Sequence, residues 1–346
     1  MINKWFKACL AIFVIVCVAL MGIMNPTPAS AAEFIIRMGN TAAWPNQPNW
    51  IMRQFKERIE AATDRIAVQL YEASAFGSNN EMVQGLQSGA MQVVLIPTGF
   101  YGVVAPSIGM LSLPGLFNDP HEVVRVLNQD TPLLDAYLEQ QGMVAVAWFY
   151  EVRDDIISLR PITQMDHFKG LKIRTYNVDV SLEYISALGA SPVLMPTADL
   201  PMALQQRTVD GAHCGTSMAA ASKLYDIVDY LLSDFCPPIT HPVMVSKLLL
   251  DELPPDLRDL VVNTIRELCV GEEGYKYAVD FVDWCYRTMA ENGVNITVPT
   301  PEFLAAQEAA VARIAPDFFA ANPQMKPIYD EITALVQQDR IKQGAK

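Results

Sequence analysis

The alternation of strand-like and helix-like segments constrains the fold of this chain more than any other feature. In the first half, three segments rich in β-branched and aliphatic residues read as strands: 33–39, 65–73 and 90–97. Between them, residues 49–63 and 79–89 repeat apolar side chains at helical spacing. The continuous apolar run 90–97 is typical of a strand covered on both faces. This half predicts a βαβαβ unit around a mostly parallel sheet.

The second half repeats the plan. Strands are predicted over residues 170–176, 191–196 and 210–214, with helices over 177–189 and 197–209. Two such units predict an α/β protein of two lobes, joined by hinge strands. Open α/β sheets bind ligands at the carboxyl ends of their strands, so we expect a ligand cleft between the lobes.

A helical stretch follows from Pro254 to Asn292, and Pro254 and Pro255 suit its first turn. As one unbroken helix it would be about 58 Å long, more than one lobe, and would brace both. Gly271 and Gly274 mark the places where it would kink. A short strand over 293–299 and further helix complete the chain.

The first 31 residues have the pattern of an export signal. Lys4 and Lys7 precede an apolar run, and the Ala-Ser-Ala segment 29–31 fits the small-x-small rule of signal peptidase. An uncleaved anchor is the alternative, because the run approaches the ~18 residues that mark a spanning segment. The helix-breaking Pro26 favours cleavage, so we predict a cleaved signal peptide and an exported protein.

The net charge limits the classes of partner that the protein is expected to bind. The formal net charge is −13, and loss of the leader with its two lysines would make it more negative. An acidic surface disfavours nucleic acid and anionic membranes. An anionic ligand would then need a local cationic pocket. We expect a monomer.

The cysteines leave two possibilities open. Outside the leader the chain carries Cys214, Cys236, Cys269 and Cys285. They could pair in three ways or stay as buried thiols. No two form a C-x-x-C pair, so neither zinc nor thioredoxin-like chemistry is favoured, and no metal or cofactor is predicted.

The segment 215–219, GTSMA, resembles the nucleophile segment of subtilisin-like peptidases and makes Ser217 a candidate nucleophile. A serine nucleophile needs a base and a group that orients the base. No histidine of the chain has the expected His-Gly-Thr-His context. A secreted serine hydrolase is therefore a remote alternative, and we expect no enzyme. Ser217 is better explained as a hydroxyl at a helix start.

Arg174 lies at the end of the predicted strand 170–176, where the cleft is expected. A guanidinium presents a planar fork that matches a carboxylate with two parallel charge-assisted bonds. On strand position alone, pairing with a structural acid is an equal alternative.

Several ordered segments carry a family resemblance. HFKGLKIRTY (167–176), ALGASPVLMPTADLPMALQQRTVDGA (187–212) and VSKLLLDELPPDLRDLV (245–261) resemble the DctP-type solute-binding proteins of tripartite ATP-independent periplasmic (TRAP) transporters. SAFGSNNEMVQGLQSGAMQVVLIP (74–97) and LSLPGLFNDPHEV (111–123) resemble the other half of that family. The likeness runs from about Phe34 to Leu260, followed by a similar helical tail.

The resemblance implies a periplasmic-binding-protein-like fold, capture of an organic acid outside the cytoplasm, and delivery to integral membrane permease subunits. It implies that Arg174 binds the ligand carboxylate and that Arg153 assists. A sensor or scavenger of the same fold stays an alternative.

Some positions depart from the family pattern. Cys214 stands where the family often has asparagine, and Thr197 where it often has an aromatic residue. Loss of such groups favours a less polar acid, either aromatic or a 2-oxo acid. The ligand-binding candidates are Arg174, Arg153, Trp44, Phe76, Tyr101, Tyr150, Tyr176, Thr197, His213, Cys214 and Ser217.

The predicted organisation has four parts. The signal peptide covers 1–31, and lobe I covers 32–152 with about 237–275. Lobe II covers 153–236 with about 293–335. The long helix, about 254–292, would span both.

Overall fold

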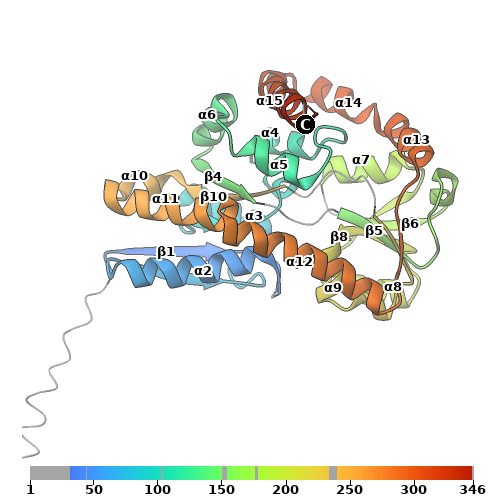
Figure 1. Ribbon diagram of the computed structural model, residues 1–346, viewed down its shortest axis with the longest axis horizontal. Coiled ribbons are helices and arrows are strands. Elements are labelled where there is room, and N and C mark those ends of the chain that lie inside the picture. Colours follow the sequence, from blue (N-terminus) through green and yellow to red (C-terminus); the bar gives the residue numbers. More distant parts are fainter. Residues whose placement is uncertain are drawn as a thin grey trace, which may run out of the picture.

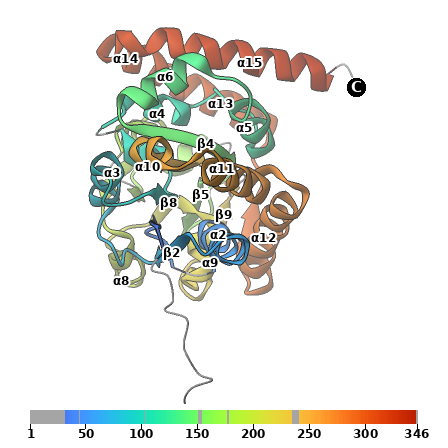
Figure 2. The same cartoon turned by 90° about the vertical axis from the view of Figure 1, so that its left-hand side faces the viewer.

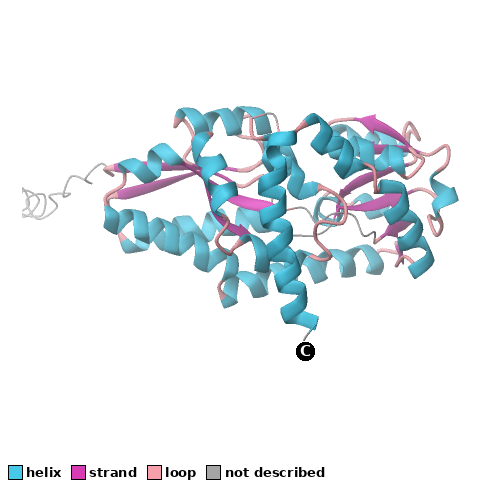
Figure 3. Cartoon of the chain, turned by 90° about the horizontal axis from the view of Figure 1, so that it is seen from above, coloured by secondary structure: helices cyan, strands magenta, loops and turns pink. Residues whose placement is uncertain are grey.

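The computed structural model describes residues 32–43, 45–102, 104–149, 154–175, 178–233 and 240–344. The predicted signal peptide and the crossing residues between the lobes lie outside these ranges. The described chain forms two sheets surrounded by helices (Figure 1). Figure 3 shows the strands gathered into two groups toward opposite ends of the molecule. The expected two-lobed α/β architecture is confirmed.

The first sheet has five strands in the order β2-β1-β3-β10-β4. Its strands are β1 (Phe34–Gly39), β2 (Ile66–Tyr71), β3 (Val93–Val94), β10 (His241–Ser246) and β4 (Met143–Phe149). β1 pairs in parallel with β2 and β3, whereas β10 runs antiparallel to both of its neighbours. β10 is the one reversed strand, so β1 to β4 all end at the same edge. We call this sheet and the helices packed on it lobe one.

The second sheet has six strands in the order β11-β9-β5-β8-β6-β7. Its strands are β11 (Asn295–Thr297), β9 (Tyr230–Leu232), β5 (Asp154–Ser158), β8 (Gly211–Gly215), β6 (Lys172–Thr175) and β7 (Ser191–Leu194). Only β5 is reversed, since it runs antiparallel to β8 and β9 while β6 pairs in parallel with β7 and β8. This sheet and its helices are lobe two.

Two of the connections between the lobes run from strand to strand, and both leave and enter the sheets at the same edge. β4 ends at Phe149, and β5 then begins at Asp154, opposite the last residue of β8. β9 ends at Leu232, and β10 begins at His241, opposite Phe149. Both passages therefore join the carboxyl edges of the two sheets, where the parallel strands end.

The helices cover both faces of each sheet. On lobe one, α2 (Gln47–Ala62) and α11 (Pro255–Val270) pack on one face. α3 (Asn79–Ser88), α5 (Pro120–Leu127) and α6 (Pro132–Gln140) cover the other. On lobe two, α7 (Asp179–Ala187) covers one face, and α8 (Leu200–Gln205) and α9 (Thr216–Ala221) the other. The short helices α4 (Pro106–Gly109) and α10 (Lys247–Glu252) belong to lobe one.

The predicted single helix 254–292 is two helices. α11 ends at Val270, and α12 (Glu272–Glu291) begins after the extended Gly271. A side chain at Gly274 would overlap the carbonyl oxygen of Leu268, so the two helices meet too closely for any other residue. α11 packs on lobe one, and α12 continues to α9 of lobe two (Figure 1). The expected brace is therefore present, but broken at the predicted kink.

α12 also contacts lobe one through an aromatic stack. The rings of Trp50 on α2 and Tyr277 on α12 lie 4.3 Å apart and nearly parallel. The stack continues along α12 through Phe281 to Trp284.

The C-terminal helices tie the two lobes together from the other side. α13 (Pro301–Val311) and α14 (Ile314–Ala321) contact α7 of lobe two. α15 (Lys326–Gly344) lies across α5 and α6 (Figure 2). Residues up to about 335 were predicted to belong to the second lobe, whereas α15 contacts α5 and α6 of lobe one. The other predicted lobe boundaries stay predictions.

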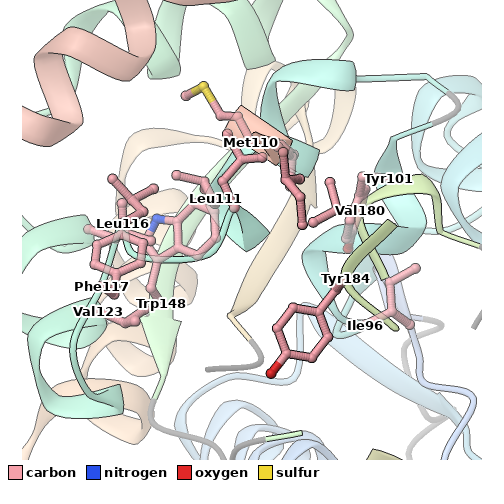
Figure 4. Packing of buried hydrophobic residues seen from close by; sticks show 14 of the residues in the cluster. Ile96, Tyr101, Met110, Leu111, Leu116, Phe117, Val123, Trp148, Val180 and Tyr184 are labelled. Atoms are coloured by element: carbon pink, nitrogen blue, oxygen red, sulfur yellow. The ribbon is translucent and has the colours of Figure 1, made fainter. Parts of the chain in front are cut away.

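One apolar cluster is shared by the two lobes. It contains Trp148 and Val123 of lobe one together with Val180 and Tyr184 of α7 (Figure 4). The C-terminal helices add to the same cluster, for example through Ile332. The lobes are thus packed on one another in this arrangement.

Candidate functional site

Arg174 is buried on β6 at the carboxyl edge of lobe two, with 2 % of its surface exposed. Its Nε donates a hydrogen bond to the carbonyl oxygen of Met195 at 3.0 Å, and its Nη2 donates to Thr197 Oγ1 at 2.9 Å. Both acceptors follow β7, the neighbouring strand, and Thr197 itself is exposed. The guanidinium therefore lies just beneath an exposed loop. These two acceptors are uncharged, so they orient the fork without adding negative charge.

His213 lies on β8, beside β6, and is also buried. Its Nδ1 is 3.2 Å from Thr175 Oγ1, and its Nε2 is 4.0 Å from a carboxylate oxygen of Asp154. Burial and the positive charge of Arg174 lower the pKa of His213 to about 3. The imidazole is therefore neutral at physiological pH. Its ring packs 5.6 Å from that of Tyr184.

Cys214 is fully buried, and burial raises the pKa of its thiol to about 12. It therefore stays protonated and uncharged at neutral pH. Its cross-strand neighbour Asp155 accepts hydrogen bonds from the hydroxyls of Thr216 and, at 2.6 Å, Tyr286. Burial and the nearby Asp155 raise the pKa of Tyr286, which keeps its hydroxyl a donor.

The structure brings four of the predicted site residues together at one edge: Arg174, Thr197, His213 and Cys214. Thr197 accepts a bond from Arg174, and the charge of Arg174 acts on both His213 and Cys214. The sequence predicted that these residues lie at strand ends. It could not predict the hydrogen bond from Arg174 to Thr197, which depends on β6 and β7 being neighbours.

Two aromatic candidates on lobe one take part in side-chain packing. Tyr101 is fully buried in the shared apolar cluster, and its hydroxyl donates to the Val94 carbonyl at 3.4 Å. Burial raises the pKa of Tyr101. Phe76 is half-buried and meets Tyr71 edge to face at 5.7 Å. Four other candidates lie outside the described residues: Trp44, Tyr150, Arg153 and Tyr176.

Ser217 is the second residue of α9, and the residue that precedes this helix is Gly215, which provides no side-chain cap. Ser217 therefore lies at a helix start, as expected, but it is not the N-cap residue of α9. Among the described residues we find no hydrogen bond between Ser217 and a histidine. The geometry thus gives no support to a serine hydrolase.

Cys214 and Cys269 are reduced thiols. Cys285 is buried, and Cys236 lies outside the described residues. Within the described ranges no three metal-binding side chains are grouped closely enough to hold a metal ion. None of the helices in these ranges combines the length and the apolar character needed to cross a membrane.

Two polar side chains of lobe one were missed by the sequence analysis. Gln47, at the start of α2, is fully buried, and neither its Nε2 nor its Oε1 has a hydrogen-bond partner among the described residues. His241, at the start of β10, is buried against Phe149, and its Nδ1 also has no partner in the described part of the chain. Their helical and strand contexts gave no signal that distinguishes them from ordinary polar residues at element ends.

Comparisons with known proteins point in one direction. Residues 46–322 match the family model described as "Bacterial extracellular solute-binding protein, family 7" (DctP). A 2,3-diketo-L-gulonate-binding periplasmic protein of Escherichia coli is 23 % identical over 80 % of this chain and 85 % of its own length. A sialic acid-binding periplasmic protein of Vibrio cholerae is 24 % identical over 70 % of this chain and 76 % of its own.

Solved structures show the same fold. A TRAP periplasmic solute-binding protein of Sulfitobacter sp. NAS-14.1 with bound β-D-galacturonate superposes with a TM-score of 0.80. It is 19 % identical, and the match covers 87 % of this chain and 99 % of that one. A Haemophilus influenzae protein of the same kind, with bound L-gulonate, also gives 0.80, with 21 % identity and the same coverage.

Proposed function

Because the chain belongs to bacterial extracellular solute-binding protein family 7, the DctP family, we propose that it captures an organic acid by binding the ligand carboxylate to Arg174. The observation that carries this proposal is the placement of Arg174. It is a buried guanidinium, oriented by two uncharged acceptors, at the edge of lobe two that faces lobe one.

The chemistry of the guanidinium supports this assignment. Its fork matches the two oxygens of a carboxylate, and charge-assisted hydrogen bonds each contribute roughly 1.5–3 kcal/mol. Nε and Nη2 are held by Met195 and Thr197, so the plane of the fork is fixed before a ligand arrives. A fixed fork loses less conformational entropy on binding. The neutral His213 beside it adds no competing charge.

We propose that capture proceeds by separation and closure of the lobes. Arg174 is almost completely buried in the present arrangement, and separation of the lobes would open the carboxyl edge at which it lies to an anion. The ligand stabilises the closed arrangement to the extent that it binds this form more tightly. Closure excludes water and strengthens the ion pair, because the local dielectric falls.

The relatives bind 2,3-diketo-L-gulonate and sialic acid, as their names state. We propose an organic acid for this chain too, delivered by a periplasmic monomer, freed of residues 1–31, to integral membrane TRAP permease subunits. We expect Arg153 to assist Arg174 and expect no catalysis.

The test is calorimetric titration of the mature protein with a panel of organic acids. Replacement of Arg174 by Met should cost about 3 kcal/mol or more, a loss of two decades in affinity, because the buried carboxylate loses its partner. Arg174→Lys should recover only part of this, since the point charge lacks the fork.

Arg160, which follows β5 of the same sheet, offers a matched control. It lies at the opposite edge of lobe two, where its exposed side chain pairs with Asp210. Arg160→Met should therefore leave affinity unchanged. Near-normal affinity in Arg174→Met would refute the assignment.

A further inference from the structure

Gln47 is fully enclosed, yet its side chain makes no hydrogen bond to any described residue. A carboxamide has two donors and one acceptor group, and burying them without partners costs free energy. Protein interiors rarely tolerate such groups without a reason, and functional sites are where they collect.

The position of Gln47 on its helix shows where the carboxamide lies. Gln47, Ile51 and Phe55 are spaced four residues apart and form one stripe along α2. Ile51 and Phe55 are part of the apolar core between α2 and the sheet of lobe one. Gln47 continues this stripe by one turn toward the helix start, next to the end of β1. The apolar contact with the sheet thus ends in an amide at the carboxyl edge.

This edge faces Arg174. β1 and β4 end at the carboxyl edge of lobe one, and β6 ends at that of lobe two. Both passages of the chain join these two edges, from Phe149 to Asp154 and from Leu232 to His241. Gln47 and Arg174 therefore border the same junction from opposite lobes.

The loop around Gln47 satisfies its other amides. Asn40 donates to Asn49, which donates to the Ala42 carbonyl, and Asn46 donates to a neighbouring carbonyl while capping α2. The segment is thus built to pair its polar groups internally, with Gln47 as the exception.

His241 is a second polar group of the same kind at this edge. Its ring stacks on Phe149 at 5.2 Å, and its Nδ1 has no partner among the described residues. Burial lowers the pKa of His241 to about 3, so the ring is neutral. Lobe one therefore offers the junction hydrogen-bonding groups without charge.

We propose that Gln47 is the recognition residue of lobe one, and that its carboxamide exchanges hydrogen bonds with a hydroxyl group of the acid whose carboxylate Arg174 binds. This inference rests on the proposed function. A hydroxyl both donates and accepts, as a carboxamide does. A second carboxylate could accept from Gln47 Nε2 but could not donate to its Oε1, and a bare apolar end would leave Gln47 and His241 unmatched. The ligand class is then a hydroxylated monocarboxylic acid. The less polar acid expected from Cys214 and Thr197 is the alternative to this ligand class.

Gln47→Met separates this role from a structural one. The thioether keeps the shape and removes the unpaired amide, so the ligand-free protein should melt about 2 °C or more higher. Affinity for D-glucuronate should fall about tenfold or more, because the hydroxyl loses its partner. A structural glutamine would show the opposite change in melting temperature.

Gln307 provides the matched control. It is also buried, but its Nε2 donates to Tyr184 at 2.6 Å. Gln307→Met should lower the melting temperature, since a buried hydrogen bond is lost, and leave affinity unchanged.

The ligands for both variants and the wild type are D-glucuronate, succinate and phenylacetate, measured by calorimetry. We expect the wild type to prefer D-glucuronate. Preference for succinate or phenylacetate, or unchanged affinity in Gln47→Met, would overturn this inference while Arg174→Met still abolished binding. Unchanged affinity in Gln47→Met would mean that ordered water, and not the ligand, satisfies the Gln47 amide. Failure of the wild type to bind any of a panel of hydroxylated and unhydroxylated acids would overturn the proposed function as well.

Discussion

The attachment of α15 to α5 depends on two reciprocal ion pairs. Arg125 on α5 donates to both carboxylate oxygens of Asp339, at 2.8–3.1 Å, and Arg340 on α15 donates to both oxygens of Glu122, at 2.8 and 3.1 Å. Only 6 % of the Asp339 side chain is exposed, against 37 % of Arg125. We predict the effect of removing Arg125.

Arg125→Met leaves a nearly buried carboxylate without its partner. Loss of one member of a fully buried pair costs about 3–5 kcal/mol, whereas an exposed pair contributes about 1 kcal/mol or less. Since the carboxylate is buried and the guanidinium is partly exposed, we expect Arg125→Met to lower the free energy of unfolding by about 2–3 kcal/mol. For a protein of this size that lowers the melting temperature by about 3–4 °C. Asp339→Leu added to Arg125→Met should recover most of the loss, because no unpaired charge remains.

The stabilisation by the Arg125–Asp339 pair should depend on pH. The Arg125 guanidinium lowers the pKa of Asp339 below its ordinary value. The pair therefore stabilises the fold above the ordinary carboxyl pKa of about 4, and its contribution disappears as the pH falls through the lower folded value. The difference in melting temperature between wild type and Arg125→Met should be full at pH 7 and should shrink below about pH 4.

The assay is thermal unfolding of the two single variants, the double variant and the wild type. Lys247→Met is the control, because Lys247 pairs with Asp251 on the surface of α10 and should contribute about 0.5 kcal/mol or less. A cost below about 1 kcal/mol for Arg125→Met, or a double variant no more stable than the single one, would refute the argument from burial.

Two further predictions concern packing. Gly274→Ala should destabilise the protein by about 1–3 kcal/mol in urea unfolding, because its Cβ would overlap the Leu268 carbonyl. Gly109→Ala should stabilise the protein by about 0.5–1 kcal/mol, because the new Cβ has no atom within 4 Å and the φ of −57° is helical. Equal changes in the free energy of unfolding for the two glycine variants would contradict this geometry. Burial raises the pKa of Cys214 to about 12 and also raises that of Cys269, so peptide mapping should find neither alkylated by iodoacetamide at pH 8 until the protein is unfolded. Modification of the native protein at either position would show that the region opens.

Much of the fold follows from local pattern. The alternation of short apolar runs and amphipathic helices predicted the two lobes, and Gly271 predicted the break between α11 and α12. The run 90–97 predicted a longer strand than β3, which pairs only at Val93 and Val94. The apolar character was right, but strand length depends on partners, and β1 and β10 each meet β3 over only two residues.

The candidate site was predicted in part. Arg174 was identified from its place at a strand end and from a family resemblance. The hydrogen bonds of Arg174 to Met195 and Thr197 could not be predicted, because they depend on the order of strands in the sheet. Gln47 could not be identified from the sequence either, since a polar residue at the first position of a helix is ordinary until its burial is known. Tyr101 lies buried in the shared apolar cluster, and its role in ligand binding stays a prediction, because an aromatic residue near a predicted cleft is as well suited to the core.

The place of β10 has a consequence for how the chain is assembled during synthesis. β10 separates β3 from β4, yet it is formed by residues 241–246, which follow most of lobe two in the sequence. A growing chain that has released only its first 149 residues lacks the strand that joins these two, so lobe one cannot close first as an independent unit. Domains usually fold in order from the N-terminus. Here the earlier lobe waits for the later one, and the nascent polypeptide stays incomplete until about two thirds of it has emerged.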